Sequence, residues 1–159
     1  MKRHLLFHTL IICLAVSLFT GCKDKPDNPD GPVIPSGHVT TPDWEVSLDY
    51  DYSSSMTVIA EVDLTKTYNA LTPNDWHIDT ADLLAAFAGE ECVGVSKPID
   101  NLFFLYITSP SQGNEEITLR YYSVRLHNIF QANTKLTFVN GARLGSVNEP
   151  LRPLFEEMK

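Results

Sequence analysis

Short runs of alternating apolar and polar residues, separated by turn residues, fill this chain from Thr41 onward. The clearest run is Met56–Leu64, where apolar side chains occupy every second position over nine residues. A period of two sends successive side chains to opposite faces, so this run predicts a strand with one buried and one solvated face. Such strands must form a layered sheet structure, because each has a face that only another layer can cover.

Turn signals narrow the fold class further. Gly89-Glu90 is a two-residue connection with glycine first, which is typical of a type II′ hairpin turn. Asp79–Phe87 has some helical spacing, with Asp82 as a cap, but the alternation that follows favours a hairpin. About seven to nine strands predict an all-β, antiparallel, immunoglobulin-like sandwich in residues 42–159. The expected strands besides Met56–Leu64 are Trp44–Leu48, Leu83–Ala88, Glu91–Ser96, Leu102–Ile107, Glu116–Tyr122, Val124–Phe130 and Leu136–Val139.

Three features of these segments bear on the core. Leu102–Ile107 is apolar on both faces, which predicts a central strand. Trp44 lies in the first alternating segment and is expected in the core. Tyr121 and Tyr122 are neighbours on one strand, so one of them must look outward or meet another layer.

Residues 1–21 have the features of an export leader. A basic start precedes an apolar stretch of about 15 residues, which is too short for a bilayer span of about 20. The sequence Thr20-Gly21-Cys22 resembles a bacterial lipobox, whose cysteine is acylated on sulfur before cleavage. Cys22 is therefore the expected lipidation site, and the membrane an expected partner through this lipid. A plain secretory leader cleaved near Gly21 is the alternative, and a transmembrane anchor is less favoured.

Residues 22–41 are predicted to form a tether. They have no apolar period, and Pro26, Pro29, Pro32 and Pro35 recur every three residues, which is the turn length of polyproline II. Such a segment would hold the folded domain away from the lipid surface.

Charge and cysteine content exclude several function classes. Loss of the leader leaves 10 basic and 20 acidic residues, a balance that opposes binding to nucleic acid. Cys92 is then the only thiol of the domain, and Glu90 and Glu91 make its surroundings acidic. We therefore expect Cys92 to be a small buried hydrophobe and not a nucleophile.

The sequence contains no pattern that predicts catalysis or metal binding. A Ser-His-Asp arrangement and a G-x-S-x-G elbow are both missing, and the histidines are few and scattered. Asp49 and Asp51 lie in a polar turn, but no calcium-loop spacing accompanies them. We expect no metal, no cofactor and no enzymatic activity.

Asp75, Trp76 and His77 are the candidate ligand-binding residues. They follow Pro73 and Asn74 in a turn-rich loop that no apolar alternation explains. A flat indole beside polar groups is suited to stacking against a sugar. The alternative is that Trp76 folds back over one end of the sandwich.

Four segments, taken in order, now permit a comparison with a known family. They are Ser55–Val62, Asp82–Val95, Glu115–Tyr122 and Leu144–Leu151. Together they resemble a β-sandwich module of Bacteroidetes surface lipoproteins and secreted multidomain proteins, over roughly residues 43–155. Such modules commonly carry arginine where this chain has Val93. The family offers no catalytic residues to transfer, and it implies surface display, adhesion and capture of external material.

The resemblance also implies a location. It suggests a lipid anchor in the outer membrane, with the domain at the cell surface and the periplasmic face left open. Asp79-Thr80-Ala81 resembles the O-glycosylation site of that bacterial group, which would place Thr80 on an exposed loop. We expect a non-catalytic binding or adhesion module with an extracellular glycan or protein ligand. The alternatives are a carbohydrate-binding accessory of a polysaccharide-uptake system and a structural subunit of a surface complex.

Overall fold

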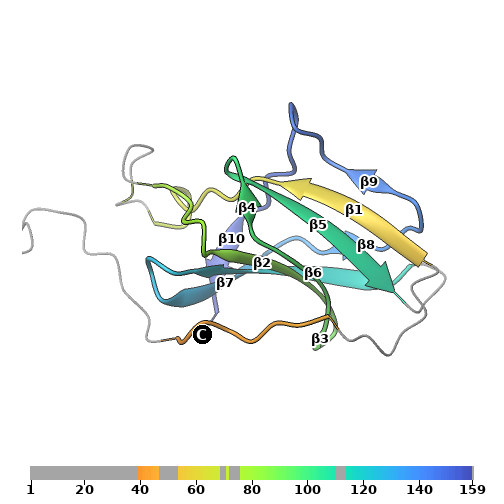
Figure 1. Ribbon diagram of the computed structural model, residues 1–159, viewed down its shortest axis with the longest axis horizontal. Helices are drawn as coiled ribbons and strands as arrows, with labels where there is room; N and C mark the ends of the chain where they lie inside the picture. Colours follow the sequence, from red (N-terminus) through yellow and green to blue (C-terminus); the bar gives the residue numbers. More distant parts are fainter. Residues whose placement is uncertain (1–38, 47–53, 69–70, 72–75, 110–113, 159) are drawn as a thin grey trace, which may run out of the picture. The chain divides into compact units, whose positions relative to one another are not determined.

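The computed structural model describes residues 39–46, 54–68, 71, 76–109 and 114–158. This part of the chain contains ten β-strands and no helix, and the strands form two packed sheets (Figure 1). The predicted all-β sandwich is confirmed, and the strand number exceeds the estimate because three strands are only two residues long. The strands are β1 (Ser54–Ala60), β2 (Leu83–Ala88), β3 (Glu91–Ser96), β4 (Pro98–Ile99), β5 (Leu102–Ser109), β6 (Glu116–Ser123), β7 (Asn128–Ala132), β8 (Leu136–Thr137), β9 (Arg143–Leu144) and β10 (Phe155–Glu157).

Both sheets are mainly antiparallel. The first, which we call the β1 sheet, has the order β4-β5-β1-β9. Its strand β1 pairs with β5 from Ser54 opposite Ser109 to Ala60 opposite Phe103. The second, the β6 sheet, has the order β10-β7-β6-β2-β3, with β8 beside β6. Strand β9 is parallel to β1 and departs from the predicted antiparallel pattern, because the chain after β8 returns along the free edge of β1.

The core lies between the sheets and contains the inward-facing side chains of both. On β6 the alternating residues Ile117, Leu119 and Tyr121 are fully buried, as predicted. Met56 and Val58 of β1 are buried from the opposite side. Burial of these apolar surfaces is the main favourable contribution to folding.

The longest predicted strand, Met56–Leu64, is shorter in the structure. Strand β1 ends earlier, although Val62 and Leu64 remain buried. The β1–β5 ladder ends with Ala60 opposite Phe103, close to the start of β5. Asp63 then turns the chain, with its Oδ1 accepting hydrogen bonds from the backbone N–H and the hydroxyl of Thr65. The alternation of burial therefore continues beyond the backbone pairing.

Strand β5 is central in its sheet, as predicted for Leu102–Ile107. Its inward residues Phe103 and Leu105 are fully buried, whereas Phe104 and Tyr106 on the outer face are 38% and 58% exposed. The apolar residues on both faces therefore predicted the central position of the strand correctly, although its outer face remains partly exposed.

Residues 39–46 form no strand, so the prediction of a strand at Trp44–Leu48 is wrong over its described part. Trp44 packs edge-on against Phe87 of β2, with ring centroids 5.6 Å apart. It is half-buried there and does not belong to the core between the sheets, contrary to expectation. Leu48 lies outside the described residues.

The β2–β3 hairpin is confirmed. Gly89 has a φ of 61° and Glu90 does not have a positive φ, which is the combination of a type II′ turn. The helical alternative for Asp79–Phe87 is excluded, because most of this segment belongs to β2.

The predicted strand Val124–Phe130 begins too early. Residues 124–127 form the turn between β6 and β7, and His127 has a positive φ of 46°. Tyr121 and Tyr122 do point to opposite faces, and both are buried. Tyr122 is covered because its hydroxyl lies 3.4 Å from the carbonyl oxygen of Val39 in the N-terminal segment.

Two glycines, Gly94 and Gly145, lie where no larger residue fits. A Cβ atom on Gly94 would lie 2.8 Å from the carbonyl oxygen of Tyr106, so glycine lets β3 pass close to β5. Gly145 has a φ of 76°, and a Cβ atom there would overlap the carbonyl oxygen of Ile59. Glycine at this position lets the returning chain lie against β1.

Candidate functional site

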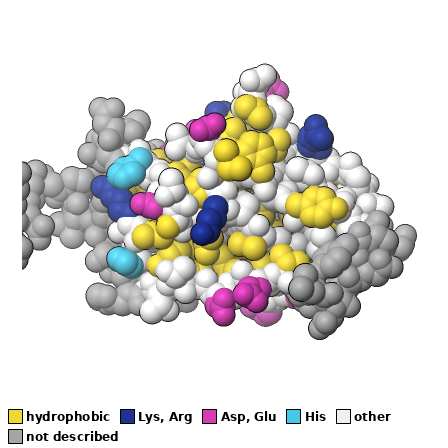
Figure 2. All heavy atoms as spheres, viewed as in Figure 1, with side chains coloured by type: hydrophobic (Ala, Val, Ile, Leu, Met, Phe, Trp, Pro, Cys, Tyr) yellow, Lys and Arg dark blue, Asp and Glu magenta, His cyan; other side chains and the backbone are white. Residues whose placement is uncertain are grey.

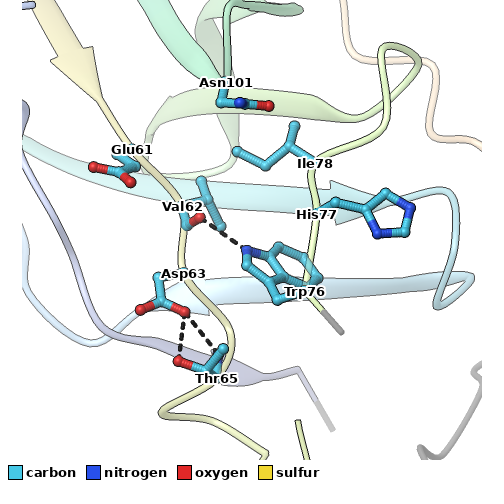
Figure 3. A pocket seen from close by; sticks show the side chains of 8 residues that line it. All are labelled: Glu61, Val62, Asp63, Thr65, Trp76, His77, Ile78 and Asn101. Atoms are coloured by element: carbon cyan, nitrogen blue, oxygen red, sulfur yellow. Dashed lines mark hydrogen bonds between the residues drawn. The ribbon is translucent and has the colours of Figure 1, made fainter. Parts of the chain in front are cut away.

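A cavity of about 310 Å³ lies at one end of the sandwich (Figure 3). Three segments form it: the chain leaving β1, the loop before β2, and the turn between β4 and β5. Its lining residues are Glu61, Val62, Asp63, Thr65, Trp76, His77, Ile78 and Asn101. The volume is at the lower end of the range for small-molecule sites.

Trp76 is held in a defined position in the wall of this cavity. Its indole Nε1 donates a hydrogen bond to the carbonyl oxygen of Val62 at 3.2 Å (Figure 3). Its ring also packs against Tyr121, with centroids 6.2 Å apart and an interplanar angle of 72°. The half-buried indole therefore covers one end of the core, as in the alternative interpretation of the sequence, and it also lines the cavity.

Two polar side chains, those of Asp63 and Asn101, line the cavity together with the indole. Asp63 uses Oδ1 to accept the two hydrogen bonds from Thr65, at 2.9 and 2.6 Å. Asn101 is exposed in the β4–β5 turn, where Asp100 and Asn101 have φ values of 51° and 65°. Two successive positive φ values are typical of a type I′ hairpin turn. In Figure 3 Asn101 lies above Ile78, and Asp63 lies to the left of Trp76 with Thr65 below it.

Two residues that line the cavity, Glu61 and His77, each contact an arginine side chain. Glu61 Oε2 lies 2.8 Å from Arg152 Nη2 and points away from the indole (Figure 3). His77 is exposed, and its Nδ1 lies 3.4 Å from Arg125 Nη1 in the β6–β7 turn. The imidazole of His77 is directed away from Trp76 (Figure 3).

The remaining residues predicted from the sequence are placed as follows. Asp75 lies outside the described residues. Thr80 is exposed in the turn that precedes β2, as expected for the glycosylation candidate. Cys92 of β3 is half-buried, its Sγ lies 3.6 Å from the Gly94 carbonyl oxygen, and burial raises the pKa of its thiol. A raised pKa lowers the thiolate fraction and opposes a nucleophilic role.

A buried carboxylate fixes the loop that carries Trp76 and Thr80. Asp82 is 1% exposed, and it accepts hydrogen bonds from the Tyr121 hydroxyl, the Val124 N–H and the Asp79 N–H. Burial raises the pKa of the Asp82 carboxyl, and these hydrogen bonds oppose the increase. Asp82 is thus a positioning residue: it ties the loop before β2 to the end of β6.

The part of the chain that the structure describes contains no group of three or more His, Cys, Asp or Glu side chains that could hold a metal ion. None of its segments is a helix that is both long and apolar enough to cross a bilayer.

Sequence reasoning missed Asp63 and Asn101 as neighbours of Trp76. Asp100-Asn101 between two apolar segments is a readable turn signal, but nothing in the sequence places that turn beside the loop before β2. No family model, curated protein or solved structure matches this chain.

Proposed function

We propose that the protein is a non-catalytic, lipid-anchored binding or adhesion module at the outer surface of a bacterial cell. The observation that carries the binding role is the fixed indole of Trp76 in the wall of a cavity with polar side chains at its rim. A rigid aromatic surface with a few polar groups is the usual composition of a ligand site. Cys22 in its lipobox-like setting supports the anchor, and the proline-rich residues after it support a tether.

Protease treatment of intact cells tests the surface location. Protease added outside the cell should remove the domain while periplasmic proteins stay intact. Protection of the domain would contradict surface display. Cys22→Ser should release the protein from the membrane fraction, and mass spectrometry of the native protein should find acyl chains on Cys22.

The outer face of the β1 sheet supports a second candidate, a structural subunit of a surface complex. Ile99, Phe104 and Tyr106 lie there and are 63%, 38% and 58% exposed, and hydrophobic side chains gather over β4 and β5 (Figure 2). Exposed aromatic residues are enriched at protein interfaces. Stoichiometric partners recovered from solubilised membranes, and lost with Tyr106→Ser, would favour this function over a free binding module.

Thr80 is the proposed glycosylation site, because its turn is exposed and anchored by Asp82. Intact-mass measurement of the native protein should show a glycan that Thr80→Ala removes. An unchanged mass in this variant would contradict the assignment.

A further inference from the structure

We propose that the cavity beside Trp76 binds a neutral sugar, either a short oligosaccharide or the end of a longer chain. This inference names the ligand class of the binding function proposed above and rests on it. The geometry that supports it is a fixed indole that lines the same cavity as the polar side chains of Asp63 and Asn101 (Figure 3).

The indole is suited to stacking because it does not need to reorganise. Its N–H is already bonded to Val62, and its ring packs against Tyr121, so the orientation is set before a ligand arrives. Preorganisation reduces the entropy lost on binding. The C–H face of a pyranose can lie against such a ring and bury apolar area.

Asp63 and Asn101 supply unused hydrogen-bonding groups. Within the described residues, Oδ2 of Asp63 and the side-chain amide of Asn101 make no hydrogen bond. A carboxylate oxygen accepts, whereas an amide both donates and accepts. This set matches hydroxyl groups, which also donate and accept.

The charges around the cavity favour a neutral ligand over a cationic one. Glu61 is paired with Arg152, and the guanidinium group of Arg125 contacts His77, which lines the cavity. Oδ1 of Asp63 already accepts two hydrogen bonds from Thr65. A site for a quaternary ammonium would instead surround the cation with aromatic faces, and Trp76 is the only aromatic residue among the lining residues described.

The volume of the cavity limits the size of the ligand. About 310 Å³ is at the lower end of the range for small-molecule sites, so the cavity suits a short sugar or the end of a longer chain.

Trp44→Phe makes the experiment direct, because it leaves Trp76 as the only tryptophan of the chain. The detergent-solubilised protein carrying Trp44→Phe is titrated with neutral gluco-, manno-, galacto- and N-acetylhexosamine oligosaccharides, and separately with choline, while indole fluorescence is recorded. A saturable change with at least one neutral oligosaccharide is expected. The same sugar as a long polymer should bind with similar affinity per chain end.

Asn101→Gly is the decisive variant. Glycine tolerates the positive φ of this turn and removes only the amide, so the fold should survive. Loss of one hydrogen bond should weaken binding by about tenfold. Asn114→Gly is the matched control, since Asn114 is also exposed with a φ of 67° but does not line the cavity.

The outcomes separate this inference from the general binding function. Tenfold weakening by Asn101→Gly, with no change in Asn114→Gly, supports the sugar site. A response to choline alone, equal affinities in the two variants, or no response to any of these sugars overturns it. If the sugar site is overturned but the protein captures a protein ligand at the cell surface, the proposed binding function is retained and only the sugar site is rejected.

Discussion

Two groups of residues in this molecule differ in their surroundings. The architectural group, Asp82, Gly94 and Gly145, lies in or beside strands, and each of its residues is enclosed by backbone or buried hydrogen bonds. The cavity group, Trp76 and Asn101, lies in a loop and a turn that border a cavity open to solvent. We expect the architectural group to determine stability and the cavity group to determine the proposed ligand binding.

Gly145→Ala should give the largest loss of stability. The new Cβ would overlap the Ile59 carbonyl oxygen and approach the Leu151 N–H, which are themselves hydrogen-bonded, and alanine is strained at a φ of 76°. We expect a loss of about 3 kcal/mol or more in urea unfolding. Gly141→Ala is the control, because Gly141 has a φ of 75° with no atom within 4 Å of the new Cβ. An equal loss in both variants would mean that backbone strain, and not the close contact, explains the effect.

Asp82→Asn should give the next largest loss, about 2 kcal/mol, because a neutral amide cannot accept all three hydrogen bonds and its NH₂ would face a donor. The effect should depend on pH. The folded protein raises the pKa of Asp82 above its ordinary value of 3.8, so the carboxyl binds its proton more tightly when folded.

The stabilisation linked to this proton is fully present below the unfolded pKa, and it is lost as pH rises through the folded pKa. The advantage of the wild type over Asp82→Asn should therefore shrink from about pH 3.5 toward neutral pH. Urea unfolding at several pH values checks this, and an advantage that grows with pH would contradict the raised pKa.

Trp76→Phe should have a smaller effect on stability and a larger one on binding. Phenylalanine keeps a ring against Tyr121 but loses the hydrogen bond to Val62, which should cost about 1 kcal/mol. Because the ring is then no longer held in one orientation, the loss of binding free energy should exceed the loss of folding free energy. Urea unfolding and isothermal titration calorimetry of one preparation test this, because the variant lacks the indole whose fluorescence reports binding. Trp44→Phe, which alters the contact with Phe87, is the control that leaves binding unchanged.

The sequence was most informative where a pattern depends on neighbours along the chain. The period of two identified the inward residues of β6, and Gly89-Glu90 identified a hairpin. Pairing and layering depend on distant segments, so the alternation around Trp44 did not reveal that this segment would lie outside the ladder. For the same reason the sequence indicated Trp76 as a candidate binding residue but did not indicate that Asn101 lines the same cavity.

Asn101→Gly should have the smallest effect on stability, within about 0.5 kcal/mol of the wild type. Its side chain is exposed and makes no hydrogen bond within the described residues, and glycine suits the positive φ of the turn. Asparagine also tolerates this conformation, so the substitution exchanges one compatible residue for another. Asn101 therefore contributes little to folding, and a tenfold loss of sugar binding at unchanged stability would separate the cavity from the architectural group most clearly. If instead Asn101→Gly unfolds as readily as Asp82→Asn, the turn belongs to the architecture and the division between the two groups fails.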